Sequence, residues 1–153
     1  MTILREPLID ISQTGKRMYD LVEMYHTDLY DISVMLHNVA LPVNNITLEQ
    51  WFDIVKNIPY KEDKEPIEVV ARPKIILQQW KADCKKKSIL IGSYLRCRYK
   101  AFRFIACSER KDREVHHVFT QGFLSGAWRN LDATYPEYEI FDVLPVTYQE
   151  VLQ

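Results

Sequence analysis

Apolar residues in the first part of the chain recur at three- and four-residue spacing, the period of an amphipathic helix. The run from Lys16 to Val39 predicts one long helix, straight or bent. Residues 41–45 are rich in turn formers and should end it. Thr47 with Gln50 three residues later is the capping-box pattern, which predicts the start of a second helix. The chain is therefore expected to open with two helices.

A third helix is expected from Cys84 to about Arg98. Asp83 precedes it, and an aspartate at this position can accept hydrogen bonds from the unpaired amides of the first turn. At about 100° per residue, Cys84 shares a helix face with the apolar Ile91, so the thiol should point toward the rest of the fold. The lysines at 85–87 are expected to be solvated.

Three stretches rich in β-branched and aromatic residues follow, at 101–107, 115–121 and 127–133. Polar or glycine-containing segments at 108–113 and 122–126 separate them, so they read as an antiparallel meander. Helices first and strands afterwards favour an α+β fold. We expect the N-terminal helices and the cysteine-bearing helix to pack on this sheet.

The length and composition fit one domain spanning residues 1–153. The chain is 47% hydrophobic and 27% charged, which is ordinary for a globular protein. Within it we expect an N-terminal helical extension at 1–45, a core at 46–136 and a C-terminal tail at 137–153. The net charge of -1 gives no global field that would attract nucleic acid or an anionic membrane, so neither is expected as a partner.

The N-terminal residues do not read as a secretory signal, because Arg5, Glu6 and Asp10 interrupt any apolar core. No segment approaches the ~18 uninterrupted apolar residues of a membrane span. The three cysteines are an odd number without paired spacing, which fits reduced thiols better than disulfides. These features predict a cytoplasmic protein.

Candidate chemistry centres on Cys84. A cysteine in the first turn of a helix can be held as a thiolate by free amides and the positive end of the helix dipole. His116 and His117 lie in the second predicted strand, where neighbouring side chains leave opposite faces, so only one can face the thiol. Asp132, at the end of the next strand, can hold the other nitrogen of that imidazole.

Three blocks of the chain, in this order and spacing, resemble the transglutaminase-like superfamily. They are Trp80-Lys81-Ala82-Asp83-Cys84 with the helix that follows, His117-Val118-Phe119, and the stretch from Gly126 to Pro136 with its Trp-x-x-Leu-Asp-Ala-Thr sequence. Arg72-Pro73, ahead of the cysteine helix, resembles the short stand-alone members found in bacteria and phages.

The resemblance implies a papain-like core in which Cys84 is the nucleophile, His117 the base and Asp132 the orienting group, with no cofactor. His116 would then be an outward-facing neighbour of His117. The backbone amide of Cys84 would be one oxyanion donor, and Gln78, Gln79 or Trp80 could lend another. Trp80 and Trp128 are candidates for lining an apolar acyl slot, and their assignment stays open.

The implied function is a cysteine peptidase, amidase or acyltransferase that acts on a peptide, protein or carboxamide substrate. Relatives of this kind recur among phage proteins, and a phage-encoded member would be located in the host cytoplasm or the virion. The alternative is a non-enzymatic virion or assembly protein on the same fold, with contacts to other copies through the N-terminal helix. Acyl transfer from a carrier cofactor, as in arylamine acetyltransferases, uses the same residue order but would need a nucleotide pocket. Metal ligation by the cysteines and histidines is not expected, since the short paired spacings of zinc sites are missing.

Overall fold

The computed structural model describes residues 11–31, 35–36, 39–40, 45–62, 70–108, 117–146 and 148–153. His116 and most of the predicted 108–113 segment lie outside these ranges. The helices are α1 (Ile11–Tyr25), the 3-10 helix η2 (His26–Tyr30), α2 (Leu48–Lys56), α3 (Pro73–Gln79) and α4 (Cys84–Cys97). The strands are β1 (Met35–Leu36), β2 (Val39–Ala40), β3 (Phe102–Ser108), β4 (His117–Leu124), β5 (Ala127–Leu131) and β6 (Tyr148–Val151).

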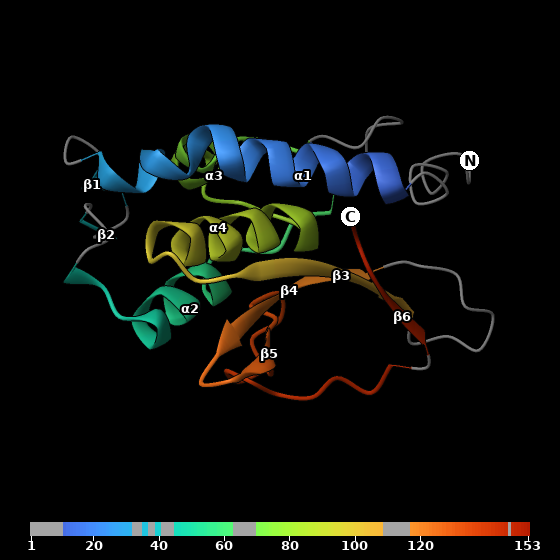
Figure 1. Ribbon diagram of the computed structural model, residues 1–153. Coiled ribbons are helices and arrows are strands. Elements are labelled where there is room, and N and C mark those ends of the chain that lie inside the picture. The colour runs from blue at the N-terminus through green and yellow to red at the C-terminus, as the bar shows by residue number, and fades with distance from the viewer. Residues whose placement is uncertain are drawn as a thin grey trace.

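The predicted α+β class is confirmed. The four longer strands form an antiparallel sheet in the order β5-β4-β3-β6. In Figure 1, α4 lies along one face of this sheet and α1 lies across α4 on the side away from the sheet. The chain between β5 and β6 returns along the opposite side of the sheet, where it buries Leu144 against Ile105 and Phe119.

Both predicted helix caps are present. Thr47 accepts a hydrogen bond from the amide of Gln50 at 3.1 Å and its own amide donates to the Gln50 side chain at 2.9 Å, which completes the capping box of α2. Asp83 caps α4 by accepting from the amide of Lys86 at 2.9 Å. The local sequence therefore determines where the second helix and the cysteine helix begin.

The first helix is shorter than predicted. It ends at Tyr25 and continues as η2, and residues 35–36 and 39–40 pair as the short antiparallel strands β1 and β2. Asp28 explains the change of winding, because Arg72 binds its carboxylate through two nitrogens at 2.6 and 2.9 Å and the amide of Lys74 adds a third contact at 3.1 Å. These tertiary contacts compete with an uninterrupted α-helix, and the residues that make them are distant from Asp28 in the sequence.

The apolar stripe of α1 packs against its own chain. Met18 and Val22 are fully buried in the main core with residues of α4. The hydroxyl of Tyr19 donates to the carbonyl of Leu152 at 2.8 Å and accepts from the amide of Phe104 at 2.8 Å. These residues of the first helix are thus covered within the molecule.

The strand boundaries differ from the predictions between β4 and β5. The predicted 122–126 segment is mostly strand, and the β4-β5 turn needs only Ser125 and Gly126, both with positive φ (52° and 81°). This is the conformation that two-residue hairpins favour.

Two elements were not predicted from the sequence. Strand β6 pairs with β3, and helix α3 begins at Pro73, a residue that suits the first position of a helix.

Within the described residues, no helix is both long enough and apolar enough to cross a membrane.

Candidate active site

Cys84 is the first residue of α4, with 7% of its surface exposed. The Asp83 carboxylate that caps the helix also binds the Lys85 ammonium at 2.9 Å, and both side chains are buried. The expectation that the lysines after Cys84 are solvated is therefore wrong for Lys85, and it is wrong for Lys87 as well. In the first turn of α4, Cys84, Lys85 and Lys87 are therefore buried and Lys86 is half-buried.

His117 and Asp132 lie close together at the end of the sheet where β4 begins and β5 ends. His117 is the first residue of β4 and Asp132 follows the last residue of β5, and both side chains are buried. Nε2 of His117 lies 2.6 Å from Oδ2 of Asp132. The other carboxylate oxygen accepts from the amide of Thr134 at 3.0 Å, which fixes the carboxylate plane. One ring nitrogen of His117 is thus committed to Asp132.

The imidazole of His117 also takes part in a hydrogen bond with Cys84. Because Nε2 is held by Asp132, Nδ1 is the nitrogen that is left for the thiol. Burial alone would lower the pKa of His117, but the hydrogen bonds to Asp132 and Cys84 and the charges on both groups outweigh it and raise the pKa to about 10. At neutral pH the histidine is therefore an imidazolium placed between a carboxylate and a sulfur.

Two aromatic rings stack near the imidazole of His117. The ring of Phe119 stacks at 6.2 Å from that of His117, and the ring of Tyr135 stacks at 6.0 Å. Tyr135 in turn contacts Tyr60, with ring centroids 5.5 Å apart, and Tyr138. These apolar faces limit the access of water to the imidazole, which strengthens its charged hydrogen bonds.

Lys87, one turn after Cys84, links the site to two other segments. Its ammonium donates to the carbonyl of Thr134 at 3.1 Å and to that of Lys56, the last residue of α2, at 3.2 Å. Burial lowers the pKa of Lys87 to about 8, against the opposing attraction of Asp132. This lysine ties the Asp132 loop to the cysteine helix.

The other predicted site residues lie at the end of α3 and on β5. Gln78 and Gln79 are exposed on the last turn of α3, and Trp80, with a left-handed backbone (φ 53°), ends that helix half-buried against the core. Trp128 pairs with Phe123, which lies six residues along β4 from His117, about 20 Å away in an extended strand.

Trp128 has partners of its own at that far end. The Arg103 guanidinium stacks 4.1 Å from its ring centroid, and the Phe123 ring meets it edge-on at 5.4 Å. A place in an acyl slot beside Cys84 is therefore ruled out for Trp128 by the sheet register.

Three neighbours of the thiol and imidazole escaped the sequence reasoning: Tyr60, Lys87 and Tyr135. For Lys87 a signal existed, because a residue three positions after Cys84 is about 60° from it on the helix wheel and so faces the same side. Tyr135 lies within the Asp-Ala-Thr-Tyr-Pro stretch, but only the fold shows that its ring reaches His117. Tyr60 is brought to the site by backbone pairing with Ala82, which the sequence does not reveal.

The two remaining cysteines, Cys97 and Cys107, are buried and are not in disulfide bonds. Cys97 donates to the carbonyl of His26 at 3.3 Å, and burial, which outweighs the hydrogen bond to Tyr30 and nearby arginines, raises the pKa of its thiol. Within the described part of the chain, no three His, Cys, Asp or Glu side chains are grouped so that they could hold a metal ion.

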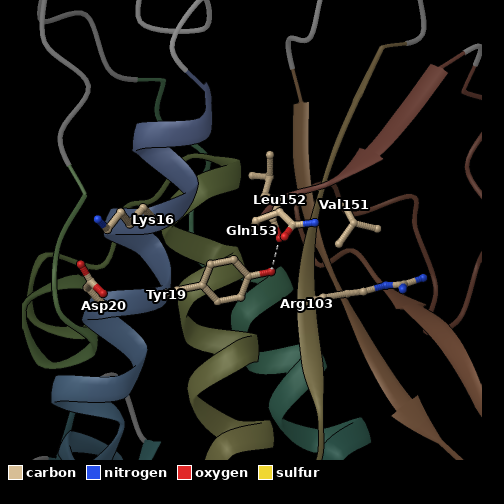
Figure 2. Close-up of a pocket in the computed structure, with 7 residues that line it drawn as sticks. All are labelled: Lys16, Tyr19, Asp20, Arg103, Val151, Leu152 and Gln153. Atoms are coloured by element: carbon tan, nitrogen blue, oxygen red, sulfur yellow. Dashed lines mark hydrogen bonds between the residues drawn. The ribbon is translucent and has the colours of Figure 1, made fainter.

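A cavity of about 400 Å³ lies elsewhere, between α1 and the end of the chain. Figure 2 shows Tyr19 reaching from α1 to the backbone beside Leu152, while Lys16 and Asp20 lie along the helix and Arg103 points away from it. None of the residues that line this cavity belongs to the Cys84 site. The cavity is therefore a separate place from the site that contains the Cys84 thiol.

Comparison with known proteins does not place the chain in a family. No family model and no curated protein sequence matches the chain. Among solved structures, the chain is similar to a putative cysteine protease from Cytophaga hutchinsonii, with a TM-score of 0.47 and 11% sequence identity. The match covers 87% of this chain and 42% of that protein, so the chain spans less than half the length of its structural neighbour.

Proposed function

We propose that this chain is a transglutaminase-like cysteine hydrolase or acyltransferase that uses Cys84, His117 and Asp132 on a peptide or carboxamide substrate. The observation that carries the proposal is the buried group formed by Cys84, His117 and Asp132, in which Nε2 of His117 lies 2.6 Å from Oδ2 of Asp132 and the same imidazole interacts with Cys84. Nucleophile, base and orienting group in mutual reach are what covalent acyl transfer requires.

In the first half of the reaction, the Cys84 thiolate attacks the carbonyl carbon and forms a C–S bond, while the carbonyl oxygen becomes an oxyanion. The backbone amide of Cys84 is one donor for that oxygen. When the C–N bond breaks, Nδ1 of His117 gives its proton to the leaving amine, and a thioester on Cys84 remains. Asp132 keeps the ring oriented throughout.

In the second half, the now neutral His117 takes a proton from the incoming nucleophile, which attacks the thioester. Water as nucleophile releases a carboxylic acid, and an amine releases a new amide; in both cases the thiolate and imidazolium are regenerated. By likeness to short stand-alone members of the superfamily, we favour hydrolysis, and the resemblance at Arg72-Pro73 favours a phage or bacterial origin.

A competing proposal is a non-enzymatic assembly or virion part. It predicts a thiol that is structural only, like Cys97. Met18 and Val22 of α1 are buried within the chain, so a contact with another copy through this helix would have to use its other residues.

Two matched substitutions on α4 test the proposal. Cys84→Ser should lower kcat/KM toward activated esters and peptide anilides on the order of 10³-fold or more, because the hydroxyl is not ionised by the same partners. Cys97→Ser makes the same atomic change at the other end of the helix and should leave kcat/KM unaltered. Equal activity of both variants and the wild type would exclude Cys84 as the nucleophile.

A further inference from the structure

Tyr60 is held beside the cysteine by backbone pairing. The segment after α2 lies parallel to the residues that precede α4, with the amide of Lys61 donating to the carbonyl of Ala82 at 3.2 Å and the amide of Ala82 donating to the carbonyl of Pro59 at 3.1 Å. Ala82 is two residues before Cys84. The position of Tyr60 is thus fixed relative to the first turn of the cysteine helix.

The side chain of Tyr60 extends the aromatic lining outward from the histidine. Its ring is 5.5 Å from that of Tyr135, which stacks on His117 at 6.0 Å. Burial, followed by the charge of Cys84, raises the pKa of Tyr60, so its hydroxyl lies within electrostatic range of the sulfur. Tyr60 and Tyr135 together form an aromatic pair that extends outward from the His117 ring, which we call the tyrosine wall.

The outer end of this wall is open. Tyr60 is 41% exposed, and its hydroxyl makes no hydrogen bond to any residue that the structure describes. Tyrosine offers a rigid apolar face and a polar tip, a combination that occurs often where proteins bind peptides. The wall itself carries no formal charge, so it favours an uncharged planar or bulky apolar group over an acidic or basic one.

We propose, on the premise of the proposed function, that the tyrosine wall is a specificity subsite for an aromatic side chain in the acyl part of a peptide substrate, within one residue of the scissile carbonyl. The aromatic side chain would lie against the rings of Tyr60 and Tyr135. The Tyr60 hydroxyl would donate to a carbonyl of the bound peptide. Tyr60 is then a specificity-determining residue that touches substrate.

The test uses covalent probes, so that it does not depend on knowing the natural substrate. Cys84 is alkylated by three acetyl-dipeptide chloromethyl ketones, Phe-Gly, Gly-Phe and Gly-Gly, and by iodoacetamide, with rates followed by mass spectrometry. In each case the thiolate displaces the halide, a C–S bond forms and chloride or iodide leaves. Iodoacetamide has no side chain and reports the reactivity of the thiol alone.

We expect at least one phenylalanine probe to react about ten-fold faster than the Gly-Gly probe. Tyr60→Ala should bring this ratio close to one, and because the ratio compares two probes on the same protein, it does not depend on any change in thiol reactivity, which the iodoacetamide rate reports separately. Tyr60→Phe should keep most of the preference, because it keeps the ring. Tyr99→Ala, which removes a tyrosine that is 88% exposed beyond the end of α4, is the matched control and should change neither rate.

Equal rates for the three peptide probes in the wild type, with rapid iodoacetamide labelling, would overturn the subsite while leaving the proposed function standing. A preference that survives Tyr60→Ala would also overturn it. Slow labelling of Cys84 by every reagent would remove the proposed function, and the subsite with it.

Discussion

His117 connects the chemistry of Cys84 to that of Asp132, and its charge state is the property that matters most. A buried imidazole on its own would be neutral. Here the 2.6 Å contact with Asp132 and the hydrogen bond to Cys84 reverse that preference and raise the pKa of His117 to about 10. The proton needed by a leaving amine is therefore in place at neutral pH.

Asp132→Asn tests this balance directly. The amide keeps the shape of the side chain but loses the negative charge, so the pKa of His117 should fall by about two pH units. An NMR titration of the ring nitrogens measures it, with Asp53→Asn on the exposed face of α2 as the control. An unchanged pKa in Asp132→Asn would mean that the carboxylate does not hold the imidazolium.

At the scale of elements, the starts of α2 and α4 followed from the sequence because their caps are local. Thr47 and Asp83 find their partners within three residues, so no tertiary information is needed. The end of α1 did not follow, because Asp28 is held by Arg72, which is 44 residues away. Likewise β6 is a short edge strand with alternating half-buried and exposed positions, and among the described strands it pairs with β3 alone.

The buried lysine of α4 gives a prediction with a definite sign. The pKa of Lys87 is lowered from its ordinary 10.5 to about 8 in the folded protein. Between these two values the unfolded chain binds more protons, so this group makes the free energy of unfolding rise with pH across that window, by about 1.4 kcal/mol per pH unit. Below pH 8 the cost of burying the charge is fully present.

Urea unfolding of wild type and Lys87→Met from pH 7.5 to 10.5 measures this contribution. Other titrating groups are common to both proteins, so the difference in free energy of unfolding between wild type and variant should increase through the window, by at most about 3 kcal/mol in total. Lys86→Met, the neighbouring and more exposed lysine, should show no such trend. A constant difference for Lys87→Met would mean that its ammonium stays charged.

At the scale of the whole molecule, α1 and the sheet share one core through α4. Burial of Met18 and the bond from Tyr19 to Leu152 join the first described helix to the last residues of the chain. The three sequence blocks predicted the partners Cys84, His117 and Asp132, which the fold brings together. The aromatic lining and Lys87 could not be predicted as a group, since they come from four separate segments.

Substitutions of Met18 and Met24 test whether α1 is part of the cooperative core or only covers its surface. Met18 is fully buried and Met24 is 65% exposed on the same helix. Met18→Ala should lower the free energy of unfolding by about 2–5 kcal/mol, because it leaves a cavity against α4. Met24→Ala should change it by less than about 0.5 kcal/mol. Similar small effects for both in urea unfolding would mean that α1 is not part of the cooperative core.

The central claim, an activated thiolate at Cys84 paired with His117, is tested most directly by the pH profile of iodoacetamide labelling at each cysteine, in the wild type and in His117→Ala. The account predicts that Cys84 labels rapidly even below pH ~7, that Cys97 labels slowly, and that the Cys84 rate at low pH falls in the variant. Slow labelling of Cys84 that does not depend on His117 would contradict the account.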